Sequence, residues 1–408
     1  MSGNFIGLAG IVVILAIAVA FSTNRKAIQL RVVGAAFALQ AAIAAFVLYS
    51  ETGKSAILSL SNGVQAVIGY SKAGIDMVFG PLANADIIGL SFAVNVLPII
   101  IFFSALMSVL YHLKIMQWVV KLVGGALRRI IGTGPIESLN AAANVFVGQT
   151  EAPLVIRPYL SGLTQPQLFA VMTSGLASVA GTVLAAYVLM GAEMKYLLAA
   201  SFMAAPGGLL MAKIIMPDDD PGVIKDTSKL KTEDSHHANV ILAAAVGAGD
   251  GLRLAVNIGA MLIAFVALIA LFNGIVGGLA GLVGIEGLTL QKILGWVFSP
   301  LMYLLSVPWE EAQAAGALFG EKLILNEFVA FSNLDTYLEG MSPRTVAVAT
   351  FSLCGFANLS SIAILLGGLG VLVPEKREII ARFGLRAVAA GSLSNLMSAC
   401  LAGLLLTF

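Results

Sequence analysis

Long apolar segments alternate with short polar ones along almost the whole chain. Stretches long enough to cross about 30 Å of hydrocarbon occur at residues 5–21, 31–49, 91–111, 167–190, 195–216, 252–282, 345–372 and 385–407. The pattern therefore predicts an all-α polytopic membrane protein with about eight transmembrane helices. The first stretch has no basic segment before it and is too long for a signal peptide, so we expect a retained span.

Other apolar segments carry polar residues at helical spacing or are interrupted. Residues 55–80 and 114–131 are typical of helices that lie in the membrane interface or pack sideways in the fold. Residues 133–164 and 288–325 each contain two short helical pieces, with interruptions at 148–153 and 307–311. Because no single piece can cross the membrane alone, each pair predicts a re-entrant hairpin.

The two halves of the chain resemble each other. Residues 175–179 (GLASV) match 355–359 (GFANL), and each stretch lies in an apolar helix that begins at a proline, Pro166 or Pro343. Each helix also follows a glutamate in a polar break. This shared order indicates inverted repeats whose broken helices meet at the membrane midplane.

Composition and charge agree with a membrane protein. Apolar residues make up 59% of the chain and charged residues 11%, and a formal charge of +1 offers no basic field for nucleic acid. Lys and Arg cluster at 24–31 and 375–386, which the positive-inside rule places in the cytoplasm, with both termini outside it. The polar stretch 217–237 is typical of a cytoplasmic linker. Cys354 and Cys400 lie in apolar surroundings and are expected to be core residues.

Two glutamates, Glu151 and Glu327, fall in otherwise apolar chain. A carboxylate at bilayer depth costs about 2.5–3.5 kcal/mol, and such groups usually face a cavity, a substrate or an ion path. Glu151 could instead cap a short helix or pair with Arg157. The helix dipole supplies only about 0.3–1 kcal/mol, which is less than the insertion cost, so both carboxylates are functional candidates.

A broken helix exposes carbonyl and amide groups, which in lipid need a polar partner. The first break offers only neutral oxygens, which suit a monovalent cation. They belong to Asn144, Val147, Ser178 and Val179. The second break offers a carboxylate, an amide and a hydroxyl, which match a polyol such as ribose. They belong to Glu327, Asn358 and Ser361.

Three segments resemble the signature segments of the concentrative nucleoside transporter family, and the similarity to bacterial sodium-coupled members covers nearly the whole chain. They are residues 143–154 (ANVFVGQTEAPL), 326–330 (NEFVA) and 354–362 (CGFANLSSI). The resemblance implies a homotrimer in the bacterial inner membrane that imports nucleosides, uridine and related ones, by symport with Na⁺. It also implies a scaffold and an elevator-type transport domain. Some bacterial relatives use protons, but Asn144 and Ser178 favour sodium.

The resemblance also implies roles and domain limits. Nucleobase contacts are assigned to Gln149, Thr150 and Glu151, with Val183 and Phe356 on the apolar side. Ribose contacts are assigned to Glu327, Asn358 and Ser361, and Na⁺ contacts to Asn144, Val147, Ser178 and Val179. The scaffold would comprise residues 1–112, with the interfacial helix 55–80, and residues 250–285. The two transport repeats would be residues 113–216 and 286–408. Residues 217–249 would form the linker and an interfacial helix.

A channel and an enzyme are the alternatives. A channel needs a continuous polar lining, whereas the polar groups here are confined to the breaks. An intramembrane enzyme needs a nucleophile or metal set, and the sequence has no His-Glu helix pair for zinc and no aspartate pair in adjoining spans. We therefore expect a transporter with no catalytic residues and no organic cofactor.

Overall fold

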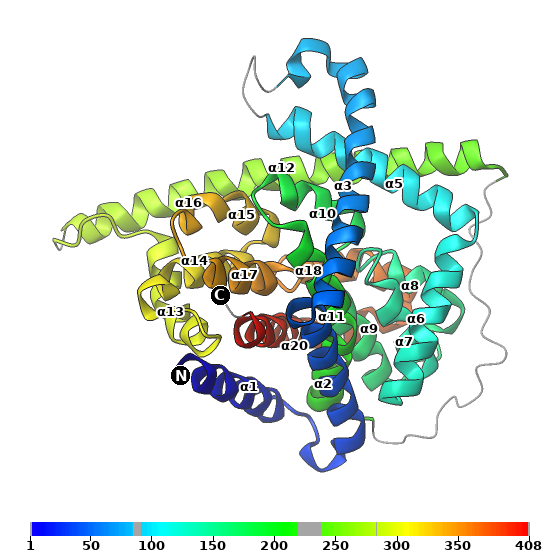
Figure 1. Ribbon diagram of the computed structural model, residues 1–408, viewed down its shortest axis with the longest axis horizontal. Coiled ribbons are helices and arrows are strands. Elements are labelled where there is room, and N and C mark those ends of the chain that lie inside the picture. Colours follow the sequence, from blue (N-terminus) through cyan, green and yellow to red (C-terminus); the bar gives the residue numbers. More distant parts are fainter. Residues whose placement is uncertain (1, 85–90, 219–237, 283, 407–408) are drawn as a thin grey trace.

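The computed structural model describes residues 2–84, 91–218, 238–282 and 284–406. All regular elements within these ranges are helices, which confirms the predicted all-α class (Figure 1). The first half contains α1 (Ser2–Ala20), α2 (Leu30–Ala44), η2 (Ala45–Tyr49), α3 (Glu51–Phe79), η4 (Phe92–Val96), α5 (Leu97–His112), α6 (Ile115–Ile131), α7 (Pro135–Ala143), α8 (Ala152–Val155), η5 (Arg157–Tyr159), α9 (Gln165–Ala177), α10 (Gly181–Leu189) and α11 (Met194–Ile215). The second contains α12 (Val240–Leu282), α13 (Leu290–Leu304), α14 (Trp309–Ile324), α15 (Glu327–Ser332), α16 (Leu334–Leu338), α17 (Pro343–Leu353), α18 (Ser361–Gly367), α19 (Leu369–Leu372) and α20 (Arg377–Leu405).

Six helical segments of the described chain are long and apolar enough to cross a membrane, or seven if the bent pair α13–α14 counts as one span. All eight stretches predicted to cross are helical. Three of them are shorter or divided. The apolar part of α1 is Phe5–Ala20, and the stretch 345–372 is split among α17, α18 and α19. The stretch 167–190 is likewise broken, between α9 and α10. Both predicted helix breaks are therefore present.

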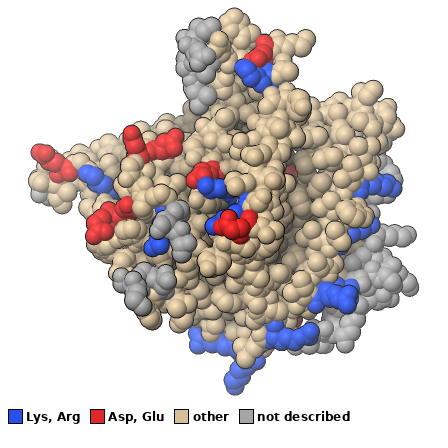
Figure 2. All heavy atoms as spheres, viewed as in Figure 1, with Lys and Arg blue, Asp and Glu red and all other residues tan. Residues whose placement is uncertain are grey.

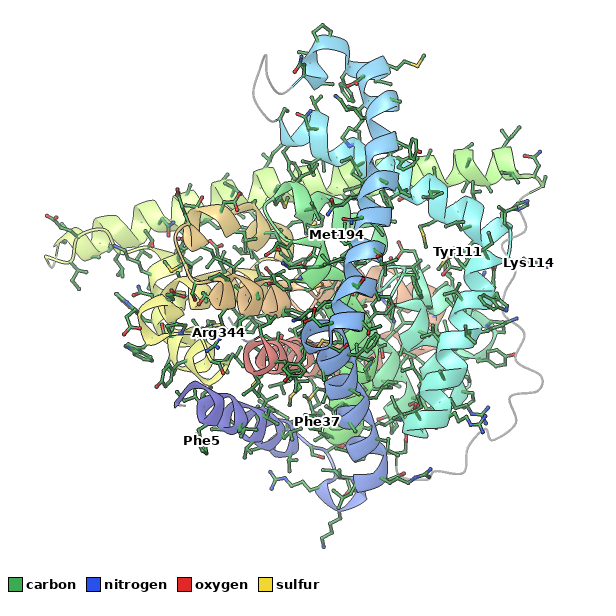
Figure 3. All side chains as sticks on the ribbon, in the orientation of Figure 1. Phe5, Phe37, Tyr111, Lys114, Met194 and Arg344 are labelled. Carbon is green, nitrogen blue, oxygen red and sulfur yellow. The ribbon has the colours of Figure 1, made fainter. Side chains whose placement is uncertain are left out.

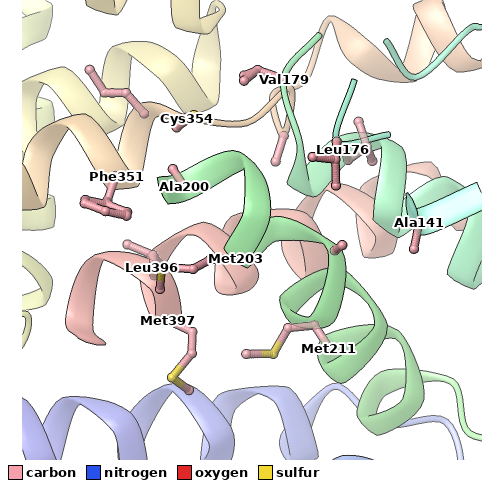
Figure 4. Packing of buried hydrophobic residues seen from close by; sticks show 14 of the residues in the cluster. Ala141, Leu176, Val179, Ala200, Met203, Met211, Phe351, Cys354, Leu396 and Met397 are labelled. Carbon is pink, nitrogen blue, oxygen red and sulfur yellow. The ribbon is translucent and has the colours of Figure 1, made fainter. Parts of the chain in front are cut away.

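The centre of the fold consists of α9, α11, α17 and α20, which are buried over most of their length. Met203 of α11, Phe351 of α17 and Met397 of α20 belong to this buried core (Figure 4). Both cysteines are buried and free, as expected for core residues. α2 packs along α11, and α1 packs along α20. The assignment of 1–112 to a scaffold remains a prediction, and α1 and α2 contact the helices of the central bundle.

The outer layer is formed by α5 and α12, and α5 packs against the N-terminal half of the much longer α12 (Figure 1). Close approach requires glycine, because a Cβ at Gly247 would lie 2.6 Å from the Ser104 carbonyl oxygen and one at Gly251 2.7 Å from the Ile101 Cα. With 43 residues α12 is about 65 Å long. Residues 240–249 form the first part of α12, and the interfacial helix expected within 217–249 stays a prediction. The predicted linker lies largely outside the described residues.

The molecular surface is mostly uncharged. Lys and Arg gather along the lower and right rims in Figure 2, the lower rim being where α1 and α2 connect. Large apolar side chains are exposed elsewhere, including Phe5 on α1 (Figure 3) and Ile263 on α12, with 73% and 76% of their surface exposed. Such a surface suits lipid or a neighbouring subunit.

The predicted sideways segments are helices. Residues 55–80 lie in α3, and 114–131 correspond to α6. The buried positions of α6 recur every three or four residues, and they include Met116, Val120, Leu127 and Ile131, whereas Trp118 on the opposite face is exposed. An amphipathic helix of this kind buries one stripe and leaves the other face free.

The order of elements from α6 to α11 repeats from α13 to α20. In both halves an amphipathic helix is followed by a second helix, a reversal, and a helix that breaks. The helices that break, α9 and α17, both begin with proline after a capping hydroxyl: Thr164 accepts from the Gln167 N–H and Ser342 from the Thr345 N–H.

The second hairpin differs from its predicted limits. α13 and α14 are bent by 117° at the predicted interruption. The chain reverses later, at Leu325 and Asn326, directly before Glu327. The two helices on either side of this turn are paired, since Asn333 at the end of α15 donates to Glu321 of α14 at 3.1 and 3.2 Å. The hairpin therefore comprises α14 and α15. In the first hairpin, the second limb consists only of the short helices α8 and η5.

Candidate substrate and ion site

The two hairpin tips and the two helix breaks surround a cavity of about 500 Å³. α12 closes its remaining side with Leu254, Asn257, Ile258 and Met261. All eight residues predicted to contact substrate line this cavity. They are Gln149, Thr150, Glu151, Val183, Glu327, Phe356, Asn358 and Ser361. The sequence placed them in four separate segments, and the fold brings those segments together.

Glu327 lies at one end of the cavity, at the first position of α15, with 4% of its surface exposed. Its Oε2 accepts a hydrogen bond from Asn358 Nδ2 at 2.9 Å, and its Oε1 accepts one from the Tyr187 hydroxyl at 3.3 Å. A carboxylate has about four acceptor positions, so these two bonds leave capacity for further donors. The arrangement suits a ligand with adjacent hydroxyl groups.

The orientation of Asn358 is fixed by its own neighbours. Its Oδ1 accepts from the Ser361 N–H at 2.9 Å and from the Ser360 hydroxyl at 2.7 Å. Because the oxygen is occupied in this way, the amide nitrogen must point toward Glu327. Asn326 similarly caps α15 by accepting from the Val329 N–H at 2.9 Å. The helix that carries Glu327 therefore has a fixed starting point.

The first hairpin tip forms the other end of the cavity. Gln149 Nε2 donates to Ser361 Oγ at 3.4 Å, while Gln149 Oε1 is buried without a hydrogen-bond partner. Glu151 is exposed and stands at the N-cap of α8 without a side-chain capping bond. The capping alternative for Glu151 is therefore not realised. Val183 and Phe356 add apolar surface between the two ends.

The predicted sodium ligands lie where the first hairpin meets the break between α9 and α10. The Phe146 carbonyl accepts from the Gly181 N–H at 3.0 Å, which joins the two segments. An added Cβ at Gly175 would lie 2.9 Å from the Gln149 Cβ and 3.7 Å from Asn144 Oδ1. Only glycine permits this approach of the hairpin tip to α9.

Asn144 provides a direct test of whether these residues fit a cation. It is 1% exposed and its Oδ1 has no hydrogen-bond partner, while its Nδ2 donates to the Asn140 carbonyl at 3.0 Å. Ser178 donates its hydroxyl hydrogen to the Ser174 carbonyl at 3.1 Å, so its oxygen lone pairs remain available. A buried oxygen without a partner is costly, and a hard monovalent cation would satisfy it. The residues therefore fit Na⁺.

The residues of the site that were not predicted include Asn257, which lines the cavity, and Tyr187, which contacts Glu327 without lining the cavity. Tyr187 of α10 contacts Glu327, and its ring stacks on Phe331 with centroids 4.3 Å apart. Asn257 is the amide that the apolar helix α12 contributes to the cavity. A polar amide within an apolar helix is a sequence signal from which Asn257 could have been predicted. Tyr187 gave no such signal, because a tyrosine in an apolar helix is ordinary.

A second cavity of about 430 Å³ adjoins the first. It lies between α5, α12 and the first hairpin, and Tyr111 at the end of α5 lines it (Figure 3). Arg157 and Asp250 line it as well, and Glu151 borders both cavities. Glu151 therefore stands at the junction between the two cavities.

Family models match the chain in three consecutive regions. Residues 9–82 and 196–403 match the N- and C-terminal models described as "Na+ dependent nucleoside transporter", and residues 93–194 match one described as "Nucleoside recognition". This chain belongs to the sodium-dependent nucleoside transporter family. It is 48% identical to the "Nucleoside permease NupC" of Helicobacter pylori, covering 98% of this chain and 97% of that one.

Further relatives are sodium-coupled or nucleoside transporters by name or belong to solved transporter structures of the same fold. The rat "Sodium/nucleoside cotransporter 1" is 39% identical over 98% of this chain and 64% of its own length. Among solved structures, CNTnw in an inward-facing substrate-bound state is 50% identical with a TM-score of 0.94, covering 99% of this chain and 98% of that chain. A double variant of CNTnw in an outward-facing state has a TM-score of 0.95, with 50% identity and coverage of 99% and 98%. The transporter is thus a multi-pass membrane protein whose coupling ion is sodium, and its relatives are not enzymes.

Proposed function

We propose that this transporter imports nucleosides, uridine and related ones, by symport with Na⁺ moving down its electrochemical gradient. The observation that carries the proposal is the single cavity that joins both hairpin tips, both helix breaks and all eight predicted contact residues. One charge crossing about 100 mV releases about 2.3 kcal/mol. That free energy supports a solute gradient of roughly fiftyfold, so nucleotide hydrolysis is not required.

The ribose binds at the Glu327 end of the cavity. The Glu327 carboxylate accepts hydrogen bonds from sugar hydroxyls, and Asn358 and Ser361 contact the same hydroxyls. Support comes from the free acceptor capacity of Glu327 beside a fixed Asn358 amide. A charge-assisted bond of this kind is stronger than a neutral one.

The nucleobase binds at the first hairpin tip. Gln149, Thr150 and Glu151 offer amide, hydroxyl and carboxylate groups to the base edge, while Val183 and Phe356 contact its faces. The unpartnered Oε1 of Gln149 supports this role, because a base N–H would satisfy it. The preference among bases depends on how these three side chains divide the donors and acceptors of the edge.

Sodium binds between the first hairpin and the break after α9. Its ligands are Asn144 Oδ1, Ser178 Oγ and the carbonyl oxygens of Val147 and Val179. The buried, unpartnered Asn144 Oδ1 supports this assignment. Among the described residues no group of three or more His, Cys, Asp or Glu side chains could hold a metal ion, and a neutral oxygen set is the chemistry that a monovalent cation prefers.

Transport proceeds by an elevator movement of the hairpins and broken helices, residues 113–216 and 286–408, against a scaffold that contains α5 and α12. The nucleoside leaves through the second cavity, past Glu151. Three copies assemble through the scaffold in the bacterial inner membrane, with both termini outside the cytoplasm. The exposed apolar surface of α12 supports burial against lipid and neighbouring subunits.

Uptake into liposomes tests the proposal. Purified transporter is reconstituted, a sodium gradient is imposed, and labelled uridine is followed with each unlabelled nucleoside as competitor. We expect accumulation above equilibrium with sodium outside and none when choline replaces it. Equilibration without accumulation would instead indicate a channel, and sodium-independent accumulation would contradict symport.

A further inference from the structure

One buried side chain joins the carbonyl ends of both broken helices. Asn395 of α20 donates from Nδ2 to the Ala177 carbonyl at 2.6 Å and to the Cys354 carbonyl at 2.9 Å. Ala177 is the last residue of α9, and Cys354 directly follows α17. These carbonyls have lost their helical partners at the breaks. A single amide therefore fixes the spacing between the two breaks.

A buried lysine orients that amide. Lys322 of α14 donates from Nζ to Asn395 Oδ1 at 2.7 Å and to the Ser352 carbonyl at 2.8 Å, and its side chain is fully buried. It lies five residues before Glu327 on the limb that leads to the second hairpin tip. The same limb accepts a bond at the Leu323 carbonyl from the Leu359 N–H at 3.1 Å. The hairpin and the second break are thereby joined at two points.

The network extends from the proposed ion ligands to the proposed ribose ligands. Ser178 follows Ala177, and its carbonyl accepts from the Phe356 N–H at 3.0 Å. Phe356 in turn lies two residues before Asn358. A displacement at the first break is therefore transmitted by Asn395 and Lys322 to α14, and by Phe356 to Asn358. Apolar side chains would fill this core without the desolvation cost of the Asn395 amide and the Lys322 amine. Packing alone therefore does not explain why these two residues are present.

We propose that Lys322 and Asn395 are positioning residues that couple sodium binding to nucleoside binding. Neither residue lines the substrate cavity. Sodium at the first break fixes the direction of the peptide groups at Ala177 and Ser178. These peptide groups in turn fix the positions of Asn395 and Lys322. Glu327 and Asn358 are then held in the arrangement that binds ribose. Coupling is reciprocal, so nucleoside binding also tightens the ion site. The inference rests on the proposed function of the two sites.

The coupling is measured as the ratio of nucleoside Kd values without sodium and with saturating sodium, on purified protein. The variants are Lys322→Met and Asn395→Ser. The matched control is Ser392→Ala, because Ser392 is a buried residue of α20 whose hydroxyl has no hydrogen-bond partner. We expect sodium to tighten binding by about tenfold or more in the wild type and the control, and by less than about threefold in the variants.

The sodium-free Kd of both variants should stay within about threefold of the wild type, because the ribose ligands remain in place. A folded variant that keeps the full sodium effect would overturn the proposal. A wild type with no sodium effect would instead contradict the proposed function itself, so the two failures are distinguishable.

A measurement on the wild-type transporter does not depend on folding of the variants. Sodium alone, compared with choline and without nucleoside, should slow hydrogen exchange in peptides that cover residues 354–361. This segment holds Asn358 and Ser361 and is not predicted to contact the ion. Unchanged exchange there, together with slower exchange around Ser178, would show that ion binding stays local and would overturn the proposal.

Discussion

Asn358 and Glu327, which are 31 residues apart in the sequence, form a hydrogen bond of 2.9 Å at one end of the substrate cavity. The first residue lies in the break between α17 and α18, and the second begins α15 at the tip of a hairpin. The bond therefore exists only when the hairpin tip and the helix break are in register. This makes the proposed ribose end of the cavity sensitive to the relative position of two separate elements.

Glu327→Gln should weaken nucleoside binding by about 10- to 150-fold, because it replaces a charge-assisted bond worth about 1.5–3 kcal/mol. The measurement is the Kd of uridine at saturating sodium. Glu310→Gln is the matched control, since Glu310 is an exposed glutamate on the same hairpin. If Glu327→Gln bound uridine with wild-type affinity, the assignment of Glu327 to the ribose would be wrong.

Tyr187→Phe should raise the nucleoside Kd by about 3- to 10-fold, because it deletes one donor to Glu327 Oε1 worth about 0.5–1.5 kcal/mol. The melting temperature should hardly change, since the ring still stacks on Phe331. Both quantities can be compared with Tyr196→Phe, whose ring pairs with Phe351 away from the cavity. A fall in stability without a change in Kd would make Tyr187 a packing residue only.

Ser178→Ala should raise the sodium concentration that gives half-maximal uptake, because one oxygen ligand is lost while the nucleoside ligands remain. Uptake at saturating sodium should be largely kept. Ser174→Ala serves as the control, since its hydroxyl donates within α9 to the Ala170 carbonyl. Equal sodium dependence in the two variants would count against the proposed ion site.

Lys213→Met should lower the free energy of unfolding by about 3–5 kcal/mol, because it leaves a buried carboxylate without its cation. Lys213 is 4% exposed and pairs with Glu137 of the first hairpin and, at 2.7 Å, with Asp218. Unfolding of purified protein measures the loss. The double variant Lys213→Met, Glu137→Gln should recover part of it, and an additive loss would contradict the pairing.

The sequence predicted best where membrane physics makes a residue conspicuous. Glu151 and Glu327 could be found because carboxylates are costly in apolar chain, and the breaks could be found from their paired glycine and polar residues. The reversal at Leu325 was missed because Pro308, only seventeen residues earlier, is a far stronger local signal. A two-residue turn capped by one asparagine leaves little trace among apolar neighbours.

Contacts between distant segments could not be predicted. Tyr187 lies 140 residues from Glu327, and Asn395 lies 218 residues from Ala177. Local hydrophobic periodicity contains no information about such pairs. The same limit explains why α1 packs on α20, at the other end of the chain, and α2 packs on α11, in its middle.

The two walls of the substrate cavity differ in chemistry. Polar groups come from the hairpins and helix breaks, whereas α12 contributes Leu254, Ile258 and Met261 with Asn257 as the amide among them. The cavity contacts about two turns of a helix that is about 65 Å long. Because Leu254, Ile258 and Met261 offer no directional bonds, they cost little to slide along in the proposed elevator movement, and we expect their substitution to change the speed of transport more than the selection of its cargo.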